Sequence, residues 1–467
     1  MHYIRLLRAP RLTYEKGRKH PWSFNIVLTV TTDLGDSFLS HDDNEAVKIN
    51  ITACWEKSSG QNEHATGSMV QAAEKTMRWT PGMRVLKTDV PVQHLVGPSL
   101  SSPGPGSGPL RVLVRAAGSK SAELATDVAL AGFEGGCGKI MPVWADVQMP
   151  GSDEAPTTCV RRLGHGERKS EPFIEIEEDI GESIARHIWD AGLMAVSRVW
   201  LANDAEAHGA ERYHWRMDAF HGLLFRGGPL NILELGCGVG ILGNGLAQAM
   251  TRTDPEGASN ILMTDLPEAE QRAKANIERL ARAGTTSIRP EYENLDWDDG
   301  RRGDLGALVK ARSWHLVVMS DCTYNVDVLP SLINTWTAIH VHNLSLHSPD
   351  SGGGPTPPPP TTYVYVAWKK RHPDENEFWR LVEDAGWILR EEDIVDLPVL
   401  GGETERIFSY LFETRSQKYE RGPETGTWRC LDNAYSKPSF EQLIERFPGE
   451  AQRVYPDRFA EYQAAAK

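Results

Sequence analysis

A cluster of glycines directly after a short apolar segment has the residue types of a ligand-binding turn. Residues 231–245 read NILELGCGVGILGNG, in which Glu234 precedes Gly236, Gly238 and Gly240. Glycines leave the backbone N–H groups of such a turn open to a ligand, and the positive end of the following helix points at the same place. The sequence therefore predicts a cofactor-binding turn between a buried strand and a helix.

Two cofactor classes use a turn of this composition. The spacing G-x-G-x-x-G, typical of dinucleotide-binding folds, is met by Gly238, Gly240 and Gly243, and Asp265 follows at about the distance of a ribose-binding acid. The alternative spacing, E-x-G-x-G-x-G, starts at Glu234. A carboxylate there suits a ligand with a positive ammonium group, such as S-adenosylmethionine, and suits a pyrophosphate poorly.

The order of the predicted elements favours the second class. Strands that end near Leu235, Asp265 and Asp321 alternate with helical segments, which indicates an α/β fold with helices on both faces of a parallel sheet. The last two predicted strands, ILREEDIVDL and RIFSYLFE, follow each other without a helix. We therefore expect a Rossmann-like, seven-stranded, mostly parallel sheet that ends in an antiparallel hairpin, as in methyltransferases and unlike the plain dinucleotide fold.

An ordered set of motifs carries a family resemblance. Trp189, the glycine turn, Asp265, the NLDW at 294–297 and the DCTY at 321–324 follow one another along the chain. With them, residues 173–413 resemble the class I S-adenosylmethionine-dependent methyltransferases. More narrowly, they resemble family sixteen, the seven-β-strand methyltransferase-like proteins that include many protein lysine methyltransferases. The resemblance implies S-adenosylmethionine as the cofactor.

The resemblance also assigns cofactor contacts. Glu234 would lie beside the aminoacyl portion, and Asp265 would accept hydrogen bonds from the ribose hydroxyls. Trp297 would stand against the adenine, with the polar residues of NLDW near its exocyclic amine, and Trp189 would border the cofactor. The expected cofactor-binding residues are Trp189, Glu234, Gly236, Gly238, Gly240, Asp265, Trp297 and Asp321.

Asp321 and Tyr324 are the expected catalytic residues. They follow a buried strand, so their side chains emerge at the carboxyl edge of the sheet, where open α/β folds bind ligands. Their D-x-x-Y spacing matches the signature of the lysine-modifying members. A lysine amine titrates near about 10.4 and must be neutral to accept a methyl group. Asp321 would orient that amine, and Tyr324 would offer a ring face to a cationic head group.

The resemblance thus predicts methylation of a lysine side chain in a protein, and two other functions stay open. One is N-methylation of a small molecule such as a nicotinamide-like pyridine. The other is a non-catalytic, cofactor-binding scaffold, against which the intact glycine turn and D-x-x-Y motif argue. A dehydrogenase would require a nicotinamide site and a hydride-transfer constellation, and the sequence offers neither.

Composition narrows the partners and the compartment. The chain has 467 residues, 40% of them hydrophobic and 24% charged, with a net charge of −14. These values are typical of a soluble globular protein and favour a basic protein partner over nucleic acid. Six scattered cysteines without a C-x-x-C argue against a zinc site or a disulfide framework and favour a cytoplasmic or nuclear location. No membrane span and no metal are expected.

The chain divides into three predicted parts. Residues 1–170 are expected to form a β-rich region, which serves substrate recognition or is a structural extension. Residues 171–415 form the methyltransferase domain, which a proline- and glycine-rich insertion interrupts at 346–361. Residues 416–467 form a tail that is expected to be helical. The acidic run EIEEDIGE at 175–182 is either a solvated face or a surface for a lysine-rich substrate.

Overall fold

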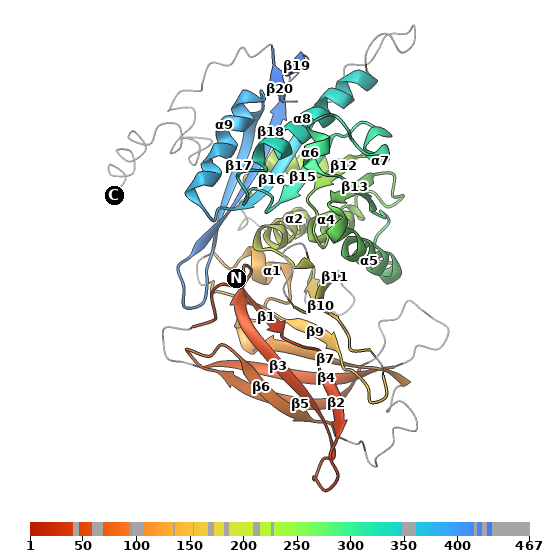
Figure 1. Ribbon diagram of the computed structural model, residues 1–467, viewed down its shortest axis with the longest axis vertical. Helices are drawn as coiled ribbons and strands as arrows, with labels where there is room; N and C mark the ends of the chain where they lie inside the picture. Colours follow the sequence, from red (N-terminus) through yellow and green to blue (C-terminus); the bar gives the residue numbers. More distant parts are fainter. Residues whose placement is uncertain are drawn as a thin grey trace, which may run out of the picture.

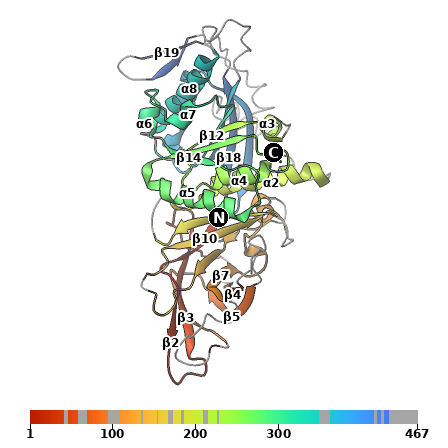
Figure 2. The same cartoon turned by 90° about the vertical axis from the view of Figure 1, so that its right-hand side faces the viewer.

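Two lobes are stacked along the long axis of the molecule. Figure 1 shows a β-rich lobe below an α/β lobe, with the N-terminus at their junction, and Figure 2 shows the same stacking from the side. The computed structural model describes residues 1–40, 46–57, 69–93, 95, 107–133, 136–152, 154–166, 172–181, 186–208, 215–225, 228–347, 361–414, 418–422 and 427–431.

The β-rich lobe contains two sheets that enclose a shared core. The first sheet has the order β2-β3-β1-β8, with β6 on the other edge of β3, and the second has the order β11-β10-β9-β7-β4-β5. Buried side chains of both sheets form one apolar cluster, because the alternating sequence turns every second side chain inward. The strands of the first sheet are β1 (His2–Leu6), β2 (Arg11–Tyr14), β3 (Trp22–Thr32), β6 (Leu86–Pro91) and β8 (Ile140–Met141). Those of the second are β4 (Val47–Lys57), β5 (Met69–Trp79), β7 (Ser107–Ala116), β9 (Val143–Asp146), β10 (Thr158–Gly164) and β11 (Phe173–Asp179).

Strand β11 joins the two lobes. It begins the stretch predicted as the methyltransferase domain, and it pairs antiparallel with β10 along its whole length. It is therefore an edge strand of the β-rich lobe. Its alternating pattern explains the outcome: Ile174 and Ile176 turn toward the α/β lobe and are buried there, so the strand serves as a joint between the two lobes.

The α/β lobe has the predicted seven-stranded sheet. The strand order is β14-β13-β12-β15-β16-β18-β17, and the neighbours are parallel except at β18, which is antiparallel to both β16 and β17. The terminal hairpin that the sequence predicts is thus confirmed. The strands are β12 (Asn231–Leu235), β13 (Asn260–Asp265), β14 (Glu291–Asn294), β15 (Leu316–Ser320), β16 (Thr362–Lys369), β17 (Ile388–Leu397) and β18 (Glu405–Thr414).

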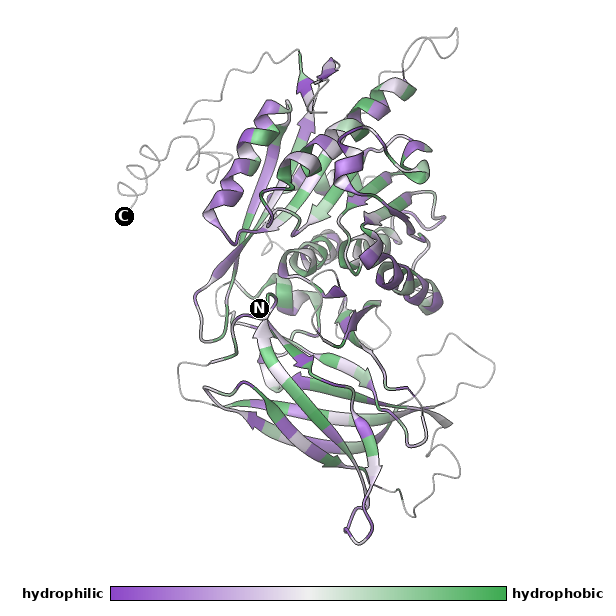
Figure 3. Ribbon diagram, viewed as in Figure 1, coloured by the Kyte–Doolittle hydropathy of each residue, from purple (hydrophilic) through white to green (hydrophobic). Residues whose placement is uncertain are grey.

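Helices cover both faces of this sheet. On one face lie α2 (Asp190–His208), α3 (Asp218–Phe225), α4 (Ile241–Met250) and α5 (Pro267–Ala283), and on the other lie α6 (Trp297–Gly300), α7 (Ala307–Lys310), α8 (Leu329–Leu346) and α9 (Glu377–Asp384). The β-rich lobe adds the short helix α1 (Ala125–Ala129). In Figure 3 the outer side of α5 is hydrophilic, as its amphipathic sequence requires.

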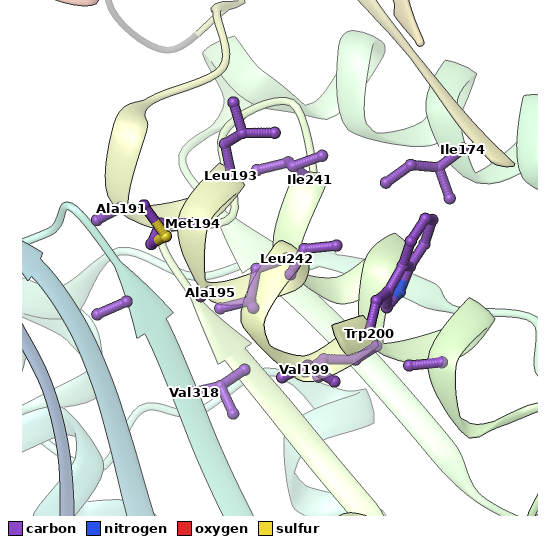
Figure 4. Packing of buried hydrophobic residues seen from close by; sticks show 14 of the residues in the cluster. Ile174, Ala191, Leu193, Met194, Ala195, Val199, Trp200, Ile241, Leu242 and Val318 are labelled. Carbon is purple, nitrogen blue, oxygen red and sulfur yellow. The ribbon is translucent and has the colours of Figure 1, made fainter. Parts of the chain in front are cut away.

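Helix α2 is the central packing element. Residues 190–200 are all buried, and the polar side chains of Asp190, Ser197 and Arg198 are buried with the apolar ones. Figure 4 shows its residues between Ile174 of β11 and Val318 of β15, with Trp200 facing Ile174. The core of the α/β lobe therefore continues into the β-rich lobe without a solvent gap at this helix.

The tail differs from its predicted helical form where it is described. Residues 418–422 and 427–431 contain a two-stranded hairpin, β19 (Tyr419–Arg421) with β20 (Trp428–Cys430), and the remainder of the tail lies outside the described residues. Most of the predicted insertion also lies outside them, after α8 ends at Leu346. None of the six cysteines, all of which lie within the described residues, forms a disulfide. Among the described helices, none is both long and apolar enough to cross a membrane.

Candidate active site

The glycine turn leads from β12 into α4 in the way the sequence predicts. Gly236, Gly238 and Gly240 have φ angles of 66°, 53° and 81°, a left-handed region that side chains disfavour. A Cβ atom on Gly236 would also collide with Cys322, and one on Gly240 with Met263. The backbone conformation therefore favours glycine at all three positions, and close packing adds to this at Gly236 and Gly240.

Glu234 is a buried carboxylate with one unsatisfied oxygen. Its Oε2 accepts a hydrogen bond from the Gly243 N–H at 3.0 Å, and among the described residues its Oε1 has no hydrogen-bond partner. Burial raises the pKa of Glu234 well above its usual range, the Gly243 hydrogen bond opposes this rise, and the charge of Asp265 adds to it. A buried acceptor without a donor fits a ligand that brings its own donor or positive charge.

Asp265 connects the glycine turn to the neighbouring strand β13. Its Oδ2 accepts from the Gly238 N–H at 2.7 Å, and its Oδ1 accepts from the Leu266 N–H at 2.7 Å. Burial raises the pKa of Asp265, and these two hydrogen bonds oppose the rise. Each carboxylate oxygen keeps a second lone pair, so Asp265 can still accept hydrogen bonds from ribose hydroxyls.

Trp297 closes the turn from the side of β14. It begins α6, and the position that a Cβ on Gly236 would take lies 3.0 Å from its Cζ2 atom. The polar neighbours in NLDW have local partners: Asp296 accepts from the Asp298 N–H at 2.8 Å, and Asn294 donates to Glu270 at 2.8 Å. The tryptophan and the glycines thus lie together, as the cofactor assignment requires.

Asp321 lies directly after β15 in an unusual conformation. It is the one non-glycine residue with a positive φ, 53°, in the part of the chain that the structure describes. Its Oδ2 accepts from the Ala191 N–H at 2.8 Å, and its Oδ1 accepts from Arg371 Nη1 at 2.7 Å. Burial raises the pKa of Asp321, while Arg371 opposes the rise. Strained backbone that the surroundings hold in place is common at functional sites.

Two aromatic residues lie near this site: Tyr324 at the surface and Trp189 against Arg371. Tyr324 is 53% exposed and stands at the surface. Burial of part of the ring raises the pKa of Tyr324, the nearby Cys322 and Asp265 add to the rise, and Arg371 opposes it. The Trp189 ring lies 5.1 Å from the guanidinium of Arg371. The structure therefore gathers Trp189 and Asp321 around Arg371, with Tyr324 within electrostatic reach.

Residues 168–385 match a family model described as lysine methyltransferase. This α/β lobe is a class I S-adenosylmethionine-dependent methyltransferase domain of that family. The strand order and the glycine turn that starts at Glu234 agree with the match, and the dinucleotide alternative has no support. S-adenosylmethionine is the cofactor. The unsatisfied Glu234 oxygen fits its ammonium group, and Asp265 fits its ribose hydroxyls. The glycine turn has no side chains that would keep the cofactor from the backbone.

A protein of the UPF0665 family from Schizosaccharomyces pombe is 23% identical over 390 residues, which cover 83% of this chain and 94% of that protein. An alignment of this length cannot fit within the methyltransferase domain alone, so it includes strands of the β-rich lobe. The chain is also similar to two solved methyltransferases. One, an S-adenosylmethionine-dependent methyltransferase from Methanosarcina mazei, is 14% identical, with 42% of this chain and 96% of that chain covered and a TM-score of 0.28. The other, an arsenic(III) S-adenosylmethionine methyltransferase from Chlamydomonas reinhardtii, is 14% identical, with 51% and 85% covered and a TM-score of 0.27.

Several charged residues of the methyltransferase site were not predicted from the sequence. Lys369 and Arg371 stand at the end of β16, at the same carboxyl edge as Asp321, and their place after a buried strand was a usable signal. Asp190 begins α2 and pairs with Lys369 at 2.8 Å. Asp33 comes from the β-rich lobe, 338 positions before Arg371, and no local pattern could connect the two.

The acidic run before α2 is engaged within the protein. Glu177 pairs with Arg272 and Arg279, and Asp179 pairs with Arg272 as well. Glu178 is fully buried against Arg161 at 2.7 Å. These ion pairs attach β11 to α5 and to its own sheet. The described part of the run is therefore neither a solvated face nor an open surface for a lysine-rich substrate.

Proposed function

We propose that the methyltransferase domain methylates the ε-amine of a lysine side chain in another protein. The observation that carries this proposal is the pairing of a buried carboxylate, Asp321, with an exposed aromatic ring, Tyr324, at the carboxyl edge of the sheet. The family description, lysine methyltransferase, supports the same substrate class. In this proposal a lysine amine, on its flexible, apolar stem, approaches the carboxylate past this ring.

Methyl transfer to lysine requires that the amine is neutral and aligned with the methyl group. S-adenosylmethionine would supply, when bound, a methyl group on a sulfonium sulfur. A neutral amine bonds to the methyl carbon as the carbon–sulfur bond breaks, the thioether leaves, and the methylated ammonium releases one proton to solvent. Asp321 keeps a free lone pair on each oxygen and accepts a hydrogen bond from the amine, which fixes its direction. Arg371, 2.7 Å from Asp321, is a fixed positive charge that disfavours the ammonium form of the incoming lysine. The face of the Tyr324 ring stabilises the cationic product.

The test is a labelling experiment with matched variants. Purified protein and tritium-labelled S-adenosylmethionine are incubated with a cell extract that lacks this protein, and labelled bands are detected by gel fluorography. Asp321→Asn preserves the shape of the side chain, and Asp327→Asn, an exposed position in the same loop, is the control. We expect one labelled protein band, reduced about 10-fold to 150-fold in Asp321→Asn and unchanged in the control, as for loss of a hydrogen bond to a charged group.

Two further readings make the outcome decisive. Mass spectrometry of the band must locate the label on a lysine, and calorimetry must show that Asp321→Asn still binds the cofactor. If Asp321→Asn does not fold, Tyr324→Ala, at an exposed position, takes its place. Label on small molecules alone would favour the nicotinamide-like alternative, and cofactor binding without any transfer would favour a scaffold. Either result would contradict lysine methylation.

A further inference from the structure

We propose that Asp33 of the β-rich lobe is a positioning residue of the methyltransferase site and acts through Arg371. The inference rests on the proposed role of Asp321 in orienting the amine. It gives the β-rich lobe a defined part in the reaction, because a side chain of that lobe fixes the group that holds Asp321. Neither the family match nor the site motifs assign a role to either residue.

Asp33 is built into the lobe junction. It follows β3 directly and is buried, and its Oδ1 accepts from the Leu34 N–H at 2.9 Å. Its Oδ2 accepts from Arg371 Nη2 at 2.9 Å, and its Oδ1 accepts from Lys369 Nζ at 2.9 Å. The cluster that contains Tyr3 and Trp200 spans both lobes, so the backbone that carries Asp33 is fixed relative to the methyltransferase sheet.

Arg371 bridges two carboxylates from different lobes. One terminal nitrogen contacts Asp33, and the other, Nη1, contacts Asp321 at 2.7 Å and the Lys369 carbonyl at 3.1 Å. The planar guanidinium holds both contacts in a fixed geometry, which a lysine ammonium could not reproduce. Burial by itself would lower the pKa of Arg371, but the charges of Asp321 and Asp33 raise it by more. The pKa of Arg371 therefore lies above its usual value, and the side chain stays charged.

The loss of Asp33 would remove one of the two carboxylates that hold the Arg371 guanidinium and would leave it Asp321, the Lys369 carbonyl and the Trp189 ring. Arg371 follows the end of β16, and its backbone N–H donates to Glu375 of the short 3-10 turn at Pro373–Asn376 at 2.8 Å. Its backbone is therefore held in either case, and the position of the guanidinium depends on its side-chain contacts. Lys369 is different, because Asp190 and Glu405 also pair with it, at 2.8 Å and 2.7 Å. Removal of the Asp33 charge therefore acts mainly on Arg371 and, through it, on the buried carboxylate of Asp321.

The experiment compares Asp33→Asn and Arg371→Lys with Glu405→Gln in the full chain. Glu405 contacts the same Lys369, whereas the hydrogen bonds of the Arg371 side chain go to Asp33, Asp321 and the Lys369 carbonyl. Glu405 is therefore the matched control. Hydrogen–deuterium exchange is measured for the peptide that spans residues 321–324, together with thermal unfolding. In parallel, the rate of tritium transfer into the labelled protein and the apparent KM for S-adenosylmethionine are determined.

We expect exchange at residues 321–324 to be about tenfold faster in Asp33→Asn and Arg371→Lys and unchanged in Glu405→Gln. The transfer rate should fall about tenfold or more in both variants, while the KM for S-adenosylmethionine stays within about twofold. A double variant that carries Asp33→Asn and Arg371→Lys should transfer no more slowly than Arg371→Lys, since both residues act on one contact. Equal effects in Glu405→Gln, additive losses, or unchanged exchange in Asp33→Asn would overturn the proposal. If exchange changed but no protein became labelled, the positioning contact would be supported and only the proposed lysine methylation would be contradicted.

Discussion

The replacement Glu234→Gln separates cofactor recognition from folding. The wild-type side chain buries a carboxylate that has one hydrogen-bond donor, Gly243, and one oxygen without a partner among the described residues. Glutamine has nearly the same shape but carries no negative charge. We therefore predict weaker binding of ligands that carry an ammonium group, without a loss of stability in the ligand-free protein.

The magnitude follows from the kind of contact that is lost. A hydrogen bond to a charged group contributes about 1.5 to 3 kcal/mol, so the dissociation constant for S-adenosylmethionine should rise about 10-fold to 150-fold. Burial raises the pKa of Glu234, so its stabilising contribution is complete below the unfolded value of 4.5 and is lost as the pH rises through the folded value. Relative to the wild type, Glu234→Gln should therefore gain stability as the pH rises above about 4.5.

Isothermal titration calorimetry provides a matched ligand pair for this test. S-adenosylmethionine carries the aminoacyl portion with its ammonium group, whereas 5′-methylthioadenosine contains the adenine and ribose without it. The substitution should weaken the first ligand and leave the second within about twofold. Chemical denaturation of the ligand-free proteins at pH 4.5 and pH 8 measures the stability difference in the same samples.

Two results would refute this reasoning about Glu234. An equal loss of affinity for both ligands would mean that the substitution disturbs the whole turn, since Gly243 contacts the same carboxylate. Unchanged affinity for S-adenosylmethionine would mean that the unsatisfied oxygen does not face the ammonium group. In either case the aminoacyl assignment would have to move to another residue.

Two other predictions concern the ribose contact and the pH dependence of folding. Asp265→Ala should weaken both S-adenosylmethionine and 5′-methylthioadenosine about 10-fold or more, because both carry the ribose; calorimetry that shows unchanged affinity would remove Asp265 from the site. Burial, followed by the N-terminal charge, lowers the pKa of His2 from 6.5 to about 4, so its contribution to stability is present above pH 6.5 and is lost as the pH falls toward 4. The free energy of unfolding should decrease by about 2 kcal/mol between pH 7 and pH 5 because of His2. Chemical denaturation should show that this decrease is absent in His2→Gln and still present in His372→Gln, a control at an exposed position.

The sequence predicts the parts of this site that are local. The strand ending at Asp265 and the turn after Glu234 follow from short patterns, because one strand end and a few glycines define them. The terminal hairpin follows from the missing helix between two strands. The alternation in β11 predicts a strand with two different faces, but it does not indicate which sheet the strand joins.

The contacts that cross between lobes could not be predicted in this way. Asp33 follows a strand of the β-rich lobe and has no motif around it, yet it pairs with Arg371. The acidic residues of β11 have the appearance of a free surface in the sequence, but two of their arginine partners, Arg272 and Arg279, lie 93 to 104 positions later, on α5. Pairings of this kind depend on tertiary packing, which neither periodicity nor residue spacing reports.

The packing of α2 explains why the two lobes form one unit. A helix that is buried on every side needs a second cover besides its own sheet, and β11 supplies that cover with Ile174 against Trp200. The same junction places Asp33 and Asp190 around Lys369, which satisfies charges that neither lobe would bury alone. Separation of the lobes would expose the apolar side of α2 and leave these charges unpaired. The geometry at Asp321 thus depends on the β-rich lobe for its packing as well as for its charge.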